Sequence, residues 1–174
     1  NWAKITCGMM GRTLDFLNVS LMSLAAAGKY FGQNRPEFEK NIQDYYELVR
    51  EQDLVLTHTL VNIQRNRSGA ATTLDDSLDV ALSVVNETDE GIIVHGARVL
   101  ATLPIADEIA VYPARSHRLP TGAPGRTSFA FAIPCDTPGL KFQCREPFDL
   151  ERSSFDHPLG SRFEEMDALA FFDN

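Results

Sequence analysis

The apolar residues in the N-terminal part of the chain recur with helical spacing. Leu17, Leu21 and Leu24 follow one another at steps of four and three residues, which places them on one helical face. A capping side chain for this helix is available within residues 13–15, and Gly28 is expected to end it. The preceding residues, 2–11, are rich in small side chains and are expected to be irregular.

A second helix is predicted directly afterwards. Pro36 suits a first helical position, because the amide hydrogen that proline lacks would have no partner there. Phe38, Ile42, Tyr45 and Val49 then recur at three- and four-residue steps. This spacing predicts an amphipathic helix that buries one face.

The periodicity changes to that of β-strands from about residue 53. Residues 55–61 form a strand-like run that enters a polar loop, and residues 80–85 and 92–99 read as two paired strands. Gly91, at the end of the loop between that pair, can take a positive φ. Further strands are expected at residues 108–112, 128–133, 140–144 and 168–172. The pattern predicts an α+β fold, with a helical N-terminal segment in residues 1–54 and a mostly antiparallel β barrel or sandwich in residues 55–174.

Composition and charge narrow the possible partners. The 174 residues are 44% hydrophobic, which is enough for a core, and the net charge of -8 argues against nucleic acid or an anionic membrane surface. Cys7, Cys135 and Cys144 are an odd number at wide spacing, so we expect reduced thiols and a cytoplasmic protein. The acidic run within residues 75–79 is best explained as a solvated surface, and no metal site is predicted.

Polar side chains gather where the first predicted strand enters its loop. His58 lies in that strand, and a neutral imidazole can accept a proton near physiological pH. The loop that follows is rich in hydrogen-bond donors that suit a phosphate or an electron-rich heterocycle: Gln64, Arg65, Asn66 and Arg67. On these residues alone, an ordinary solvated basic loop is the better interpretation.

Four blocks of sequence, in one order along the chain, carry a more specific signal. They are residues 11–16 (GRTLDF), 57–67 (THTLVNIQRNR), 96–104 (GARVLATLP) and 155–167 (FDHPLGSRFEEMD). Together they resemble the 4-hydroxyphenylacetate 3-monooxygenase oxygenase-component family of two-component, reduced-flavin-dependent phenol hydroxylases. The resemblance implies an acyl-CoA dehydrogenase-like fold whose C-terminal helical domain is absent here, so we expect the chain to be a truncated piece.

The resemblance also implies an activity and a set of partners. The expected reaction uses reduced FAD, supplied by a separate reductase, and O2 to ortho-hydroxylate a phenolic substrate to a catechol. Arg12 and His58 are the expected catalytic residues, because they would hold the phenolic oxygen and His58 could take its proton. The relatives assemble as homo-oligomers, largely through the helical domain that is absent here.

Two segments are assigned to the flavin by the same resemblance. Leu100, Ala101 and Thr102 match a segment that lies along the isoalloxazine ring, where backbone amides and a threonine hydroxyl bind the polar edge of the ring. Leu100 replaces a threonine that some relatives carry. Residues 64–67 match a second flavin-contacting stretch.

Three further positions depart from the family pattern on the substrate side. Phe16 stands where the family has a tyrosine, which removes one hydrogen bond to the substrate. Ala114 and Arg115 replace hydroxyl side chains that contact the distal acidic group of hydroxyphenylacetate. The sequence therefore predicts the reaction without naming the phenol.

Two alternatives stay open at this stage. One is a lyase resembling 4-hydroxybutyryl-CoA dehydratase, which uses flavin and an iron–sulfur cluster and needs closely spaced cysteines that Cys7 lacks. The other is that the 174-residue piece is not catalytic by itself.

Overall fold

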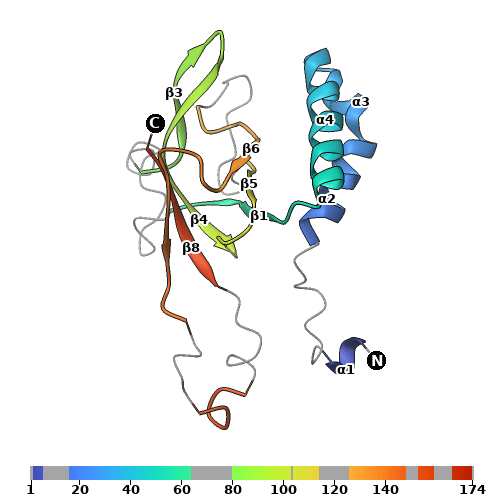
Figure 1. Ribbon diagram of the computed structural model, residues 1–174. Coiled ribbons are helices and arrows are strands. Elements are labelled where there is room, and N and C mark those ends of the chain that lie inside the picture. The colour runs from blue at the N-terminus through green and yellow to red at the C-terminus, as the bar shows by residue number, and fades with distance from the viewer. Residues whose placement is uncertain are drawn as a thin grey trace, which may run out of the picture. The chain divides into compact units, whose positions relative to one another are not determined.

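The computed structural model describes residues 2–5, 16–63, 80–102, 104–113, 126–147, 153–158 and 166–173, and for residues 2, 3 and 100–102 it describes the backbone only. The helices are α1 (Trp2–Ile5), α2 (Phe16–Ala26), α3 (Gly28–Gly32) and α4 (Pro36–Gln52), as Figure 1 shows. The strands are β1 (Leu56–Thr59), β2 (Val61–Asn62), β3 (Ser83–Thr88), β4 (Gly91–Thr102), β5 (Glu108–Val111), β6 (Phe131–Pro134), β7 (Leu140–Cys144) and β8 (Asp167–Phe172).

The chain divides into two compact units. The first comprises residues 1–56 with 106–108, and the second comprises residues 57–105 with 109–174. The core of the first unit is formed by α2 and α4, where Leu17, Leu21, Val49 and Leu56 are buried together. The division of the chain at residues 54 and 55 stays a prediction.

Helix α2 ends at Ala26, close to the predicted end at Gly28, and a short helix follows directly. Gly28 begins α3 and is buried, and a β-carbon built on it would lie 2.8 Å from Nε2 of Gln43. This atom is the end of a flexible side chain that can move, so α3 lies close to α4 here without strictly requiring a glycine, and the backbone of Gly28 is not left-handed. The expectation of an irregular start was incomplete, since Trp2–Ile5 form α1.

Helix α4 begins and ends for local reasons. Pro36 occupies its start, as predicted, and Glu37 and Glu39 lie in the first turn, where negative charge interacts favourably with the helix dipole. Asp53 ends the helix with a φ of 53°, and the amide of Leu54 donates to the carbonyl of Val49 at 3.0 Å. An aspartate therefore takes the left-handed position that glycine commonly fills.

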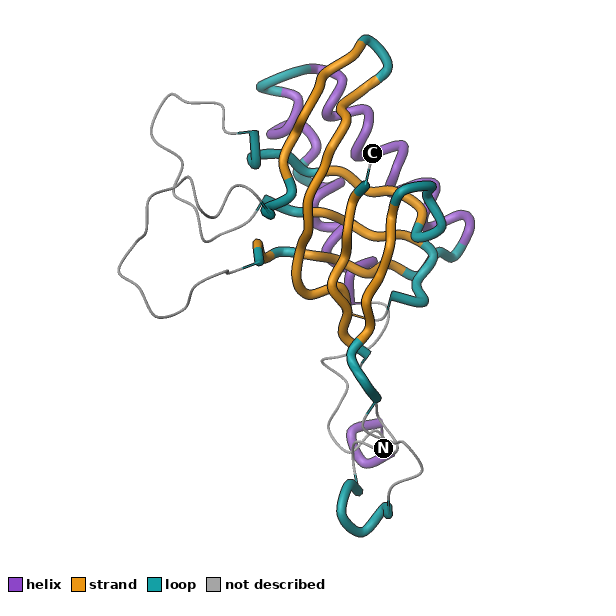
Figure 2. The backbone as a smooth tube through the Cα atoms, turned by 90° about the vertical axis from the view of Figure 1, so that its left-hand side faces the viewer, coloured by secondary structure: helices purple, strands orange, loops and turns teal. Residues whose placement is uncertain are grey.

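The strands form two sheets. One contains three strands in the order β1-β5-β6, and the other contains five, in the order β2-β4-β8-β7 with β3 paired to β4. Figure 2 shows the strands in orange. The pairs β2–β4, β3–β4, β4–β8 and β7–β8 are all antiparallel. The α+β class with antiparallel sheets is thus confirmed, and the described strands form a two-sheet arrangement and no closed barrel.

The core of the second unit follows from the alternation along β8. Ala168, Ala170 and Phe172 are buried, whereas the residues between them are partly exposed. They pack with Leu82, Ile109 and Val111, each at most 1% exposed. The hairpin of β3 and β4 turns at residues 89–90, and Gly91 has a φ of 151°, so the predicted positive φ is confirmed.

Candidate functional site

Two of the four sequence blocks contribute neighbouring strands in the second unit, and a third block ends at the first residue of another strand. Strand β2, from the block at residues 57–67, pairs with β4, from the block at residues 96–104, with Asn62 opposite Arg98. Strand β8 begins with the last residue of the block at 155–167 and lies on the other side of β4, with Asp167 opposite Thr102 (Figure 1). Segments more than a hundred residues apart in the sequence therefore meet around β4.

His58 lies in β1 between two buried threonines. Thr57 and Thr59 are at most 1% exposed, while His58 itself is half-buried. The hydroxyl of Thr59 donates to the carbonyl of Val99 at 3.1 Å, which ties this strand to β4. Burial lowers the pKa of the His58 imidazole, so the ring is neutral at physiological pH and able to accept a proton.

The lowered pKa of His58 predicts how stability depends on pH. Below about pH 6.5 the unfolded chain binds a proton at this histidine more readily than the folded chain does. The free energy of unfolding should therefore fall as the pH decreases from about 6.5 towards the folded pKa. Above about pH 6.5 the protonation of this histidine should not change the free energy of unfolding. Urea unfolding of the wild type and His58→Gln between about pH 7.5 and about pH 5.5 tests this. A steeper fall in the variant than in the wild type would contradict the prediction.

The backbone of the predicted flavin segment lies at the end of β4. The pairing of β4 with β8 is irregular there, because Arg98 is opposite Ala170 and Ala101 is opposite Ala168, so β4 contains one extra residue. Such bulges bend a strand and leave a residue outside the regular hydrogen-bond ladder, and they are common beside active sites. The bulge falls at Val99 and Leu100, where the segment assigned to the flavin begins.

The segment that leads to the predicted substrate residues Ala114 and Arg115 starts beside β1. The amide of Tyr112 donates to the carbonyl of Thr59 at 3.1 Å. Burial raises the pKa of the Tyr112 phenol, so this side chain remains neutral. The chain thus leaves β5 next to the strand that carries His58.

Phe16 is the first residue of α2 and belongs to the other unit. It is 52% exposed, which is high for a large apolar side chain. The remaining predicted residues lie outside the described part of the chain: Arg12, Gln64, Arg65, Asn66, Arg67, Ala114 and Arg115. Of Leu100, Ala101 and Thr102 only the backbone is described.

Arg98 is a residue that the sequence-based reasoning did not single out. It is 0% exposed, and among the described residues none forms a hydrogen bond with its Nε, Nη1 or Nη2. Its Cζ lies 5.8 Å from the centre of the Phe129 ring. An arginine inside a mostly apolar strand was the available signal, but the face on which it lies follows from strand pairing.

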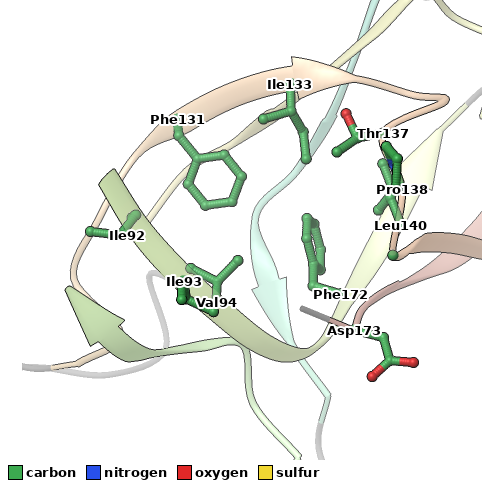
Figure 3. Close-up of a pocket in the computed structure, with 11 residues that line it drawn as sticks. Ile92, Ile93, Val94, Phe131, Ile133, Thr137, Pro138, Leu140, Phe172 and Asp173 are labelled. Carbon is green, nitrogen blue, oxygen red and sulfur yellow. The ribbon is translucent and has the colours of Figure 1, made fainter. Parts of the chain in front are cut away.

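The second unit also contains an apolar cavity at the opposite end of β4 (Figure 3). Its volume is about 470 Å³, and Ile92, Phe131, Ile133 and Phe172 contribute much of its lining. The rings of Phe131 and Phe172 meet edge to face, with centroids 6.0 Å apart. Among the described residues that line this cavity, none is a predicted site residue.

Two further features are absent from the described residues. Among them, no group of three or more His, Cys, Asp or Glu side chains is arranged to hold a metal ion. None of the described helices has the length and apolar character needed to cross a membrane.

Comparison with known proteins identifies the family. Residues 1–174 match the family described as "4-hydroxyphenylacetate 3-hydroxylase N terminal", and the chain belongs to it. The 4-hydroxyphenylacetate 3-monooxygenase oxygenase component of Geobacillus sp. (strain PA-9) is 47% identical over 174 residues, which are 99% of this chain and 35% of that protein. The chain therefore spans about a third of the length of this relative.

Solved structures agree with this assignment. The oxygenase component of 4-hydroxyphenylacetate 3-monooxygenase in complex with FAD and 4-hydroxyphenylacetate is 46% identical, with a TM-score of 0.80 over 99% of this chain and 34% of that one. An archaeal 4-hydroxybutyryl-CoA dehydratase from N. maritimus has a TM-score of 0.70 at 20% identity, over 88% of this chain and 31% of that one. The second similarity shows that the fold is shared, and nothing more.

Proposed function

We propose that this chain is the N-terminal part of the oxygenase component of a two-component monooxygenase that uses reduced FAD and O2 to ortho-hydroxylate a phenol to a catechol. The family match over residues 1–174 carries the proposal. The relative that is 46% identical was solved with FAD and 4-hydroxyphenylacetate bound, whereas the dehydratase is 20% identical. These identities favour the hydroxylase over the lyase.

The described residues fit a flavin at the end of β4. The bulge between Arg98 and Ala101 disrupts the hydrogen-bond ladder where backbone amides would bind the polar edge of the ring. The guanidinium of Arg98, which has no hydrogen-bond partner among the described residues, belongs to the same strand, where positive charge suits an electron-rich ring. Leu100, Ala101 and Thr102 would hold the ring in this proposal, together with residues 64–67. When bound, the reduced flavin supplies the activation of dioxygen.

The residues of this chain act on the phenol. His58, with its lowered pKa, accepts the phenolic proton, because a neutral imidazole is matched to that task near pH 7. Arg12 holds the resulting phenolate by charge, which makes the ortho carbon more nucleophilic. Phe16, Ala114 and Arg115 take the positions that contact the substrate in the family, and a guanidinium at residue 115 would suit a carboxylate.

The partners follow from the same proposal. A separate reductase supplies the reduced FAD, and the protein acts in the cytoplasm. It forms a homo-oligomer through the part of the relatives' sequence that this chain does not cover. Because the chain spans 35% of the Geobacillus protein, the isolated 174 residues are expected to be inactive.

The experiment that tests the function uses the full-length protein, meaning this chain joined to the remaining length found in its relatives. Chemically reduced FAD, O2 and a set of para-substituted phenols are mixed with it, and catechol is measured by chromatography. We expect catechol with the full-length protein and none with the 174 residues alone. Consumption of O2 without catechol for every phenol would refute the hydroxylase assignment.

A further inference from the structure

Arg98 is a buried charge without a counter-ion among the described residues. Its Nε, Nη1 and Nη2 have no hydrogen-bond partner in that part of the chain, and none of the ion pairs found there includes it. Burial lowers the pKa of this guanidinium, but arginine remains protonated in proteins. Buried charges are normally paired, so an unpaired one calls for an explanation.

Strand pairing determines where this charge lies. Arg98 is opposite Ala170 on β8, and residues directly opposite in an antiparallel pair point to the same face of the sheet. Ala170 is 0% exposed and belongs to the core, so Arg98 also points into the core. Its contact there is the ring of Phe129, at 5.8 Å. An aromatic face attracts a cation without cancelling its charge.

The position of Arg98 along β4 links this charge to the proposed cofactor. The strand continues directly into Leu100, Ala101 and Thr102, two to four residues further along. With a rise of about 3.3 Å per residue, these positions are roughly 7–13 Å from Arg98 along the strand. A charge inside a protein acts over such a distance, because the surrounding medium screens it much less than water does.

We propose that Arg98 is a positioning residue whose uncancelled charge stabilises the anionic reduced form of the flavin relative to the neutral oxidised form. The inference rests on the proposed function, since it requires the flavin to lie at the end of β4. Oxidised isoalloxazine is neutral, whereas reduced flavin carries a negative charge near neutral pH. If the roughly 10 Å between Arg98 and this segment along the strand is taken as the distance, with an effective dielectric constant of about 20, the charge would favour the reduced form by about tenfold in affinity.

The test uses Arg98→Met and Arg98→Lys in the full-length protein. Dissociation constants are measured for oxidised FAD and, without oxygen, for dithionite-reduced FAD. In Arg98→Met, the preference for reduced over oxidised FAD should fall about tenfold, which equals about 30 mV in the two-electron potential. Arg98→Lys keeps the charge and should stay within about twofold of the wild type. Lys141→Gln is the matched control, because it removes a positive charge that is 68% exposed and screened by water.

The apoprotein provides a second measurement that does not depend on flavin. Replacing an unpaired buried charge by an apolar side chain of similar volume should leave stability unchanged or increase it. Unfolding of Arg98→Met while Arg98→Lys stays folded would mean that the charge is compensated, which overturns the proposal. The proposal is also overturned if the Arg98→Met variant folds, binds flavin and keeps the wild-type preference for reduced over oxidised FAD. If the wild type binds neither form of FAD, the proposed function fails together with it.

Discussion

Replacing Gly96 by alanine is expected to destabilise the protein by about 4 kcal/mol. Gly96 lies in β4 with a φ of 126°, a conformation that other residues rarely adopt. A β-carbon built on it would lie 2.6 Å from the carbonyl oxygen of Ala81 and 2.8 Å from Cα of Leu82. Both contacts are with backbone, so no side-chain rotation relieves them.

The backbone around Gly96 is held in place by hydrogen bonds. The amide of Ala97 donates to the carbonyl of Val80 at 2.9 Å, and the amide of Leu82 donates to the carbonyl of Ala97 at 3.3 Å. Relief of the clash would therefore break these bonds or displace Leu82, which is 0% exposed. The substitution thus combines backbone strain with overpacking.

Gly91→Ala is the matched control for this prediction. Gly91 also has a positive φ, 151°, but no atom lies within 4 Å of a β-carbon built there. The control isolates backbone strain, for which we expect about 1–3 kcal/mol. The free energy of unfolding is measured by urea denaturation of wild type and both variants. Equal destabilisation by the two substitutions would show that the close approach at Gly96 is unimportant.

Replacing His58 by alanine in the full-length protein is expected to lower catechol formation by about 10²- to 10³-fold with chemically reduced FAD and O2. The reason is the loss of the group that accepts the phenolic proton. Oxygen consumption should continue with release of hydrogen peroxide, because activation of dioxygen by the flavin does not need the imidazole. Catechol and oxygen are measured together, so that coupling can be calculated.

His95→Ala is the control for the His58 variant. His95 also lies in a strand, but its side chain is 56% exposed and its Nδ1 is 4.0 Å from Oδ1 of Asp173. This substitution should change catechol formation by less than about twofold. Coupling that stays at the wild-type level in His58→Ala would exclude the proton-accepting role.

Local signals in the sequence were enough to predict most of the individual helices and strands. Pro36 and the three- and four-residue spacing after it predicted α4 because a helix start and an amphipathic face depend on neighbouring residues. The pairing of β3 with β4 and the positive φ of Gly91 followed from a short loop between two β-branched runs. The prediction of the activity, in contrast, came from the resemblance of four sequence blocks to a known family, and not from the periodicity of the sequence.

Only the tertiary structure decided which of these segments are neighbours. The order β2-β4-β8-β7 places strands together that are far apart in the sequence, since the hydrogen-bond ladder and the shared core select the pairing. Gly28 was predicted as a helix end, and only the structure shows that it also lies where α3 packs closely on α4. Such packing depends on residues that no local window contains.

Arg98 shows most clearly which properties the sequence determines and which depend on the tertiary structure. The sequence determined that a strand runs through this arginine, and period-two alternation allowed either face of the sheet. Pairing with Ala170 placed the guanidinium in the core, because opposite residues share a face. The sequence by itself therefore determined the elements and the family of this protein, while the buried charge beside its predicted cofactor segment arose only when three distant strands came together.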